Sequence, residues 1–196
     1  ESVLVTRQGV VKRVSAADLL RTRNGNSIIN LRQNGNVVSA FQTEESSEFA
    51  VVASDGQVLR TAVAGVPIQG PGASGVSGMK LKTGCFVLSA GKVEFSTVVV
   101  VVTDEGTCKA TDISEVPAKG RATGGVRVVR FKNFETVISY AWLGRNQQLA
   151  GIMADSVDPK KSDSTPVPIS FTSTRRDGPA IDIGFRLQHV GEYRFK

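Results

Sequence analysis

Residues 3–13 read VLVTRQGVVKR, and this stretch decides the fold because it returns twice further along the chain. Residues 50–60 read AVVASDGQVLR, and residues 100–110 read VVVTDEGTCKA. In each copy an apolar run is followed by a glycine three residues after its last position, and then by a second run. Glycine adopts the positive φ of a tight turn without strain, so each copy predicts a β-hairpin.

A second phrase recurs in the other half of each copy. It reads GNSIINL at 25–31, GVSGMKL at 75–81 and GVRVVRF at 125–131, and six residues later another apolar run begins, at 37–40, 87–90 and 137–140. From residue 25 onward each step is 50 residues, whereas the first step between the hairpin phrases is 47. Four short strands in a repeat of this length are typical of a propeller blade.

A fourth, degraded repeat keeps the register at some points. Ile181 and Leu187 fall 50 residues after Phe131 and Val137, while residues 157–164 are polar and are expected to form a loop. The predicted repeats span about 1–46, 47–94, 95–145 and 146–196. One blade cannot bury both faces alone, so the sequence predicts a single all-β, propeller-like domain, or part of one, with helix confined to short turns.

Composition narrows the class of protein. The net charge is +6, which favours a polyanionic partner, and no apolar run approaches the length of a membrane span. No signal-peptide pattern opens the chain. Its two cysteines and one histidine suggest neither a disulfide framework nor a metal site. We therefore expect a cytoplasmic protein without a metal or cofactor.

The residues do not suggest catalysis. There are two tyrosines, and Tyr140 takes the repeat position of Ala40 and Ala90, which predicts a strand-packing role. A single histidine leaves no credible Ser/His/Asp set. The glycine-rich segment at 70–75 is not followed by a helical pattern, so we interpret it as a turn and not as a phosphate loop. The expectation is a non-enzymatic domain.

Basic residues recur at equivalent positions of the repeats, which would set them at regular intervals along a curved surface. Such a track can hold a bent DNA duplex through its phosphates without reading bases, and the lack of aromatic platforms favours a duplex over a single strand. The candidate DNA-binding residues are Arg13 and Arg60; Lys80 and Arg130; Arg32, Lys82 and Lys132; and the loop cations Arg21, Arg23, Lys119 and Arg121. The alternative is a propeller-like scaffold that binds protein, marked by an apolar surface patch.

The phrases VTRQGVVKR at 5–13 and GVSGMKLKTG at 75–84 resemble the C-terminal domain of the bacterial type IIA topoisomerase A subunit, found in DNA gyrase and topoisomerase IV. The resemblance covers residues 2–144 and fades in the fourth repeat. It implies a β-pinwheel, in which neighbouring blades exchange an outer strand and duplex DNA follows a basic rim. It also implies a nucleoid-associated domain beside an ATP-dependent topoisomerase core and its ATPase subunit.

One motif departs from this family. Gyrase carries the basic box QRRGGKG in its first blade, and the matching residues 21–27 read RTRNGNS. Two arginines and one glycine remain, whereas the lysine and the other glycines are missing. The resemblance therefore implies a domain that bends DNA but wraps it less than a gyrase domain does.

Overall fold

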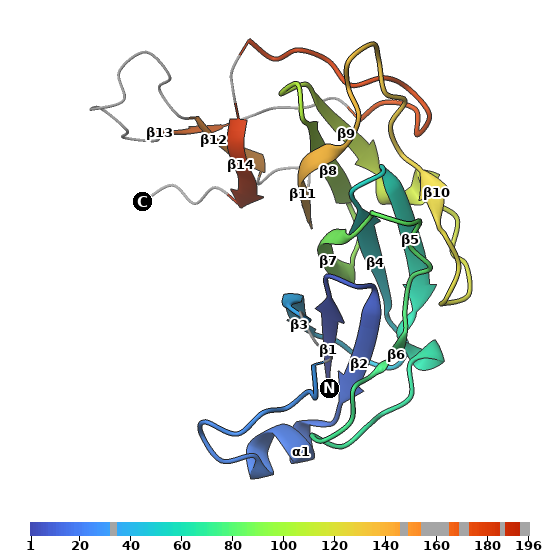
Figure 1. Ribbon diagram of the computed structural model, residues 1–196, viewed down its shortest axis with the longest axis vertical. Helices are drawn as coiled ribbons and strands as arrows, with labels where there is room; N and C mark the ends of the chain where they lie inside the picture. The colour runs from blue at the N-terminus through green and yellow to red at the C-terminus, as the bar shows by residue number, and fades with distance from the viewer. Residues whose placement is uncertain (32–34, 146–148, 154–164, 169–172, 185–186, 193–196) are drawn as a thin grey trace. The chain divides into compact units, whose positions relative to one another are not determined.

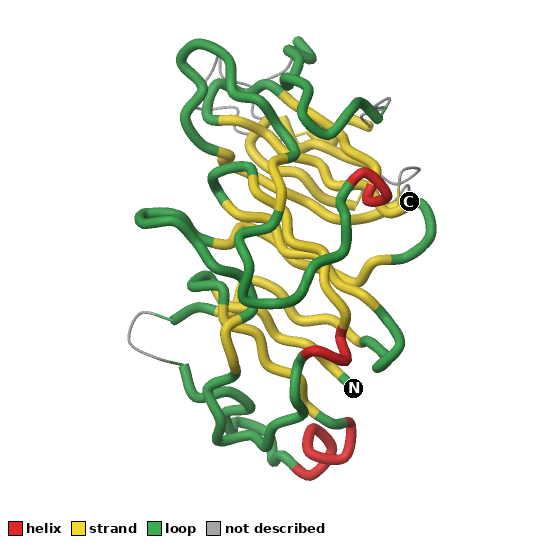
Figure 2. Tube along the Cα trace, turned by 90° about the vertical axis from the view of Figure 1, so that its right-hand side faces the viewer, coloured by secondary structure: helices red, strands yellow, loops and turns green. Residues whose placement is uncertain are grey.

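The computed structural model describes residues 1–31, 35–145, 149–153, 165–168, 173–184 and 187–192. Antiparallel strands dominate these residues (Figures 1 and 2), so the all-β prediction is confirmed. The described helical segments are short: α1 (Ala16–Arg21), η1 (Val63–Gly65) and η2 (Ile113–Glu115). The chain divides into two compact units, Glu1–Val93 with Pro117–Val126, and Glu94–Val116 with Arg127–Lys196.

The first sheet takes its last strand from the next repeat. Its order is β3-β1-β2-β6, with bounds β1 (Ser2–Thr6), β2 (Val10–Val14), β3 (Val37–Gln42) and β6 (Val76–Ser77). The hairpin turn between β1 and β2 uses Gly9 at φ +79°, as the spacing predicts. β6 pairs antiparallel with β2 through Val11 and Val76. We call β6 an exchanged strand, because it completes a sheet begun one repeat earlier.

The second sheet repeats this arrangement. Its order is β7-β4-β5-β10, with bounds β4 (Glu48–Ala53), β5 (Gln57–Ala62), β7 (Val87–Val93) and β10 (Val126–Arg127). Gly75 and Gly125 precede the exchanged strands at φ +87° and +74°. A Cβ added to Gly75 would lie 2.6 Å from the carbonyl oxygen of Val11, and a Cβ added to Gly125 would lie 2.5 Å from the carbonyl oxygen of Val58. Only glycine therefore lets an exchanged strand approach this closely.

The third and fourth sheets belong to the second unit. The third has the order β11-β8-β9, and the fourth β13-β12-β14; their bounds are β8 (Thr97–Thr103), β9 (Cys108–Asp112), β11 (Ile138–Arg145), β12 (Leu149–Met153), β13 (Thr165–Pro168) and β14 (Leu187–Glu192). Ile181 forms a β-bridge with Cys108 at the edge of β9. This bridge is equivalent to the pair that Val76 forms with Val11 in the first sheet. Residues 157–164, expected to form a loop, lie outside the described residues.

Two expected landmarks are shifted. Because Ile181 takes the place of Val76, it corresponds to Val126 and not to Phe131, so the step to the fourth repeat is five residues longer here. In the third repeat the landmark is Ile138, since Ile138 pairs with Thr103 as Val87 pairs with Ala53. Ile138 is buried, whereas Val137 is 43% exposed.

Tyr140 moves with this shift. It pairs with Val102, as Ser89 pairs with Val52, so it corresponds to Ser39 and Ser89 and not to Ala40 and Ala90. One extra residue between positions 134 and 138 causes the change, and the apolar pattern hides it because Val137 and Ile138 are both β-branched. Tyr140 nevertheless packs against the core of its unit, as predicted.

Each unit has its own apolar core. In the first unit, the inward faces of the first two sheets meet around Val5, Phe49 and Val51, all fully buried. In the second unit, Val100 and Val102 of β8 pack with Cys108 and Val190. The cores come from runs of β-branched residues, which suit a strand buried on both faces.

Candidate nucleic-acid interface

A buried lysine fixes the loop that leads into the first exchanged strand. Lys12 lies on β2 and is fully buried, and its Nζ donates to the carbonyl oxygens of Ile28 (2.8 Å), Gly70 (2.6 Å), Pro71 (2.9 Å) and Ala73 (2.8 Å). Burial lowers the pKa of Lys12. The four carbonyls replace water around the ammonium group, so the glycine-rich segment at 70–75 is a structural turn held by a cation, in agreement with its sequence-based interpretation.

Lys109 plays the same part in the second unit. It takes the repeat position of Lys12 on β9, and its Nζ donates to Thr111 Oγ1 (2.7 Å) and to the carbonyls of Val128 (2.7 Å) and Arg176 (3.2 Å). Burial lowers the pKa of Lys109 to about 8 and raises the pKa of the neighbouring Cys108 to about 12. Neither lysine was among the predicted site residues, although their shared repeat position was a signal that could have found them.

In the second sheet, Leu59 stands at the position of this lysine, and the cation comes instead from the loop that precedes β10. Arg121, a predicted site residue, donates from Nε to the Gly65 carbonyl at 2.7 Å and from Nη1 to the Ser77 carbonyl at 3.0 Å. Its guanidinium therefore holds the segment that leads into β10. Lys119 nearby is exposed, and its Nζ contacts the Gly125 carbonyl at 3.2 Å.

Two of the predicted arginines are engaged by carboxylates. The Arg13 side chain is only 3% exposed, and its Nη2 lies 2.7 Å from the Glu1 carboxylate. Arg60, at the same repeat position, lies 2.6 Å from Glu48 and is 25% exposed. The acidic partners also share a repeat position, since each glutamate lies 12 residues before its arginine, so the ion pair is itself repeated.

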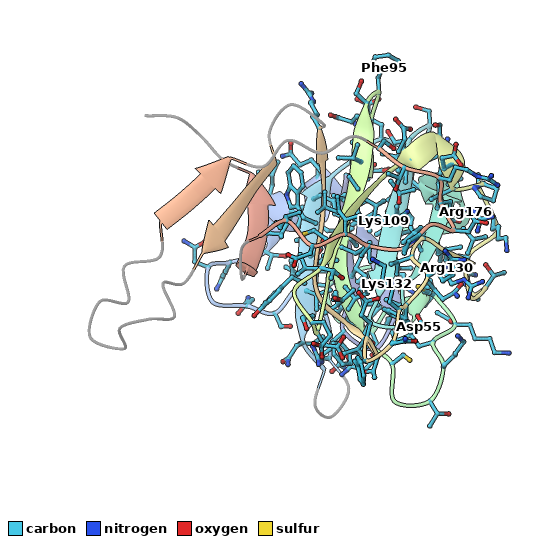
Figure 3. The ribbon with its side chains drawn as sticks, turned by 90° about the horizontal axis from the view of Figure 1, so that it is seen from above. Asp55, Phe95, Lys109, Arg130, Lys132 and Arg176 are labelled. Carbon is cyan, nitrogen blue, oxygen red and sulfur yellow. The ribbon has the colours of Figure 1, made fainter. Side chains whose placement is uncertain are left out.

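The remaining predicted cations reach the surface where the structure describes them. Lys80 and Lys82 border a shallow hollow in the first unit, together with Asp55, which lies 2.9 Å from the Lys82 ammonium. Arg130 and Lys132 occupy the same repeat positions in the second unit (Figure 3). Arg21, the last residue of α1, and Arg23, just after this helix, are exposed, and Arg32 lies outside the described residues.

The second unit holds further basic residues that the repeat did not reveal. Arg127 and Arg175 are exposed, and Arg176 donates from Nη1 to the Arg127 carbonyl at 3.0 Å. The carbonyl of Arg176 also accepts from Lys109, so the buried lysine positions this basic segment. The segment around Arg175 lies after the five-residue insertion, and for this reason it falls out of register with the earlier repeats.

In the described parts of the chain, no cluster of three or more His, Cys, Asp and Glu residues could hold a metal ion. Within the same residues, no helix is long and apolar enough to cross a membrane. The chemistry that the described surface offers is that of cations on strand ends and loops.

The strand exchange and the repeated sheets define the class as a β-propeller of the pinwheel type. A family model described as "DNA gyrase C-terminal domain, beta-propeller" matches residues 3–44, 48–93 and 97–139, more than half of the chain. The chain therefore belongs to the DNA gyrase C-terminal domain family, a domain of the topoisomerase A subunit. The fold prediction and the resemblance found in the sequence are confirmed.

Individual relatives agree with this assignment. The DNA gyrase A subunit of Haemophilus influenzae is 35% identical over 80 residues, which is 40% of this chain and 9% of that protein. The crystal structure of the C-terminal domain of DNA topoisomerase IV aligns with a TM-score of 0.83 and 24% identity, over 97% of this chain and 61% of that one. The DNA gyrase A C-terminal domain aligns with a TM-score of 0.77 and 17% identity, over 98% and 65%. The chain thus spans less than two thirds of each of these relatives.

Proposed function

We propose that this chain is a non-catalytic domain that bends or wraps duplex DNA and presents a segment of it to a topoisomerase core. One observation carries the proposal: the same two repeat positions hold exposed cations in both units, Lys80 and Lys82 in the first and Arg130 and Lys132 in the second. Phosphates follow one another at a regular spacing along a duplex, and cations repeated on equivalent strand ends can follow them. The proposed partners include the core and its ATPase subunit, in a bacterial cytoplasm.

The eleven predicted residues divide into two proposed groups. Arg13, Arg60 and Arg121 serve the fold, because carboxylates or carbonyls already occupy their guanidinium groups. The proposed DNA contacts are the exposed members, Arg21, Arg23, Lys80, Lys82, Lys119, Arg130 and Lys132, to which the structure adds Arg127 and Arg175. Arg32 stays a prediction from the sequence.

The salt dependence of binding tests this proposal. We expect K80Q/K132Q to bind duplexes of unrelated sequence more weakly by the same factor. The slope of log K against log salt should flatten by about two units, because each phosphate contact contributes roughly −0.9. Fluorescence anisotropy with 40-base-pair duplexes at several salt concentrations measures both quantities.

A matched control removes the same charge elsewhere. In R7Q/R145Q the replaced cations are already held, Arg7 by the Phe86 ring at 3.4 Å and Arg145 by Glu94 at 3.0 Å. This control should keep the slope of the unmodified chain. An unchanged slope in folded K80Q/K132Q would contradict the proposal and would favour the protein-binding scaffold.

A further inference from the structure

One loop of the second unit carries a bulky residue where its repeat has glycine. Phe134 adopts φ +76°, and Gly84, the equivalent residue of the second repeat, adopts φ +80°. A large side chain at positive φ is a conformational outlier and persists only where the surrounding structure imposes it. Phe134 is 86% exposed, so burial of its ring does not compensate for this backbone geometry.

Hydrogen bonds accepted by two carboxylates impose the conformation. Glu135 is only 7% exposed; its Oε2 accepts from the Lys132 backbone N–H at 2.6 Å, and its Oε1 accepts from the Thr107 hydroxyl at 2.6 Å. Asp104 accepts from both the backbone N–H and the hydroxyl of Thr136, at 3.1 and 2.5 Å. Glu135 and Thr136, which follow Phe134, are therefore tied to the β8–β9 turn, and Glu135 also holds the Lys132 backbone on the other side. The backbone that carries the exposed ring is thus anchored.

We propose that Phe134 inserts between stacked base pairs of the bound duplex and creates a local kink. The inference rests on the proposed DNA binding. Apolar side chains that enter between two base pairs in this way partially unstack them and bend the duplex. An anchored backbone suits the task because little backbone freedom is lost when the ring inserts. Lys132, two residues earlier and exposed, supplies a cation for a phosphate beside the opened step.

Charge and size favour DNA over a protein partner. A single aromatic ring offers about 150–250 Å² of contact area, whereas a standard protein interface buries about 800 Å² on each partner. Another exposed phenylalanine among the described residues of this unit, Phe95, is 96% exposed in the turn before β8 (Figure 3). Its neighbour Glu94 is paired with Arg145 at 3.0 Å, and no basic residue lies within two positions of Phe95 in the sequence, whereas Lys132 lies two positions before Phe134. Phe95 therefore offers a matched ring without an adjacent cation for a phosphate.

The test compares F134A with F95A in the 196-residue chain. The probes are 40-base-pair duplexes that carry 2-aminopurine at successive positions, and duplexes with fluorophores at both ends to report bending. We expect F134A to lower affinity roughly fivefold to tenfold and to abolish both the rise in 2-aminopurine fluorescence and the bend. F95A should match the unmodified chain. F134L, which keeps an apolar wedge, should restore part of both signals.

Each outcome separates the inference from the function on which it rests. F134G guards against misfolding, because glycine suits the backbone at this position, and it should behave as F134A does. If the unmodified chain binds DNA and F134A binds and bends it equally, the wedge is refuted while DNA binding stands. If F134A keeps its DNA signals but loses binding to the topoisomerase core, Phe134 is a protein contact and the inference is wrong. If the unmodified chain does not bind DNA, both proposals fail.

Discussion

At the scale of single residues, the backbone at positions 84 and 134 predicts opposite effects of two substitutions. F134G should stabilise the chain by about 1 kcal/mol, since relief of the strained φ exceeds the entropy that glycine adds to the unfolded state. G84A should destabilise it by about 1 kcal/mol. A Cβ at Gly84 would meet no atom within 4 Å, so the loss reports backbone strain alone.

Urea unfolding of the two variants beside the unmodified chain measures these changes. If F134G lowered the free energy of unfolding, the ring would contribute packing that its exposure does not suggest. If G84A were neutral, position 84 would relax to negative φ in solution.

Residues also show how far the sequence could predict the site. The recurrence of cations at Lys80 and Arg130 correctly predicted equivalent, exposed positions. The partner of Arg13 was missed although it carries a repeat signal, because Glu1 and Glu48 stand 47 residues apart, as Arg13 and Arg60 do, and each glutamate pairs with the arginine 12 residues after it. Phe134 could not be found from the sequence, since its significance lies in a backbone angle that the apolar pattern does not encode.

At the scale of elements, β9 places two titratable groups with opposite pKa shifts side by side. The pKa of Lys109 is lowered to about 8 by burial, so above that pH the folded chain holds fewer protons there than the unfolded chain. This raises stability with pH until the lysine of the unfolded chain also titrates. The pKa of Cys108 is raised to about 12, so its contribution falls once the thiol of the unfolded chain ionises near its ordinary value of 9.0.

The two effects can be separated by substitution. In a C108A background, the free energy of unfolding should rise by about 1 kcal/mol between pH 8 and pH 9 relative to C108A/K109M. Urea unfolding at each pH gives the difference between the variants, in which shared titrations cancel. Parallel profiles would mean that Lys109 keeps its proton in the fold through this range.

The elements themselves were largely predictable. Glycines three residues after an apolar run correctly placed the turns at Gly9, Gly56 and Gly106, all at positive φ. The shift at Ile138 was missed because one inserted residue between two apolar positions leaves the pattern unchanged. The five-residue shift at Ile181 was missed because an apolar residue also stands 50 residues after Phe131. Pairing partners decide register, and they become visible only when the strands are in contact.

At the scale of the whole molecule, strand exchange predicts that one repeat cannot fold alone. A fragment of residues 1–46 lacks β6, and it lacks three of the four carbonyls that surround Lys12. We expect it to be unfolded, whereas a fragment of residues 1–93 contains β6 and most of the first core and should fold. Amide dispersion in NMR spectra distinguishes the two. A well-dispersed spectrum of the 1–46 fragment would show that the exchanged strand is dispensable.

The exchanged strand also has a consequence during synthesis on the ribosome. β2 ends at Val14 and β6 ends at Ser77, so 63 further residues must emerge before the first sheet can close. At a translation rate of about 5–20 residues per second, the edge of β2 stays unpaired for roughly 3–13 s. A bare edge invites pairing with a neighbouring nascent chain, and charged residues on it oppose this. Lys12 and Arg13 lie on that edge, and Lys109 lies on the corresponding edge of β9. Lys12 and Lys109, whose ammonium groups bind loop carbonyls in the folded chain, would thus first oppose aggregation of the nascent chain.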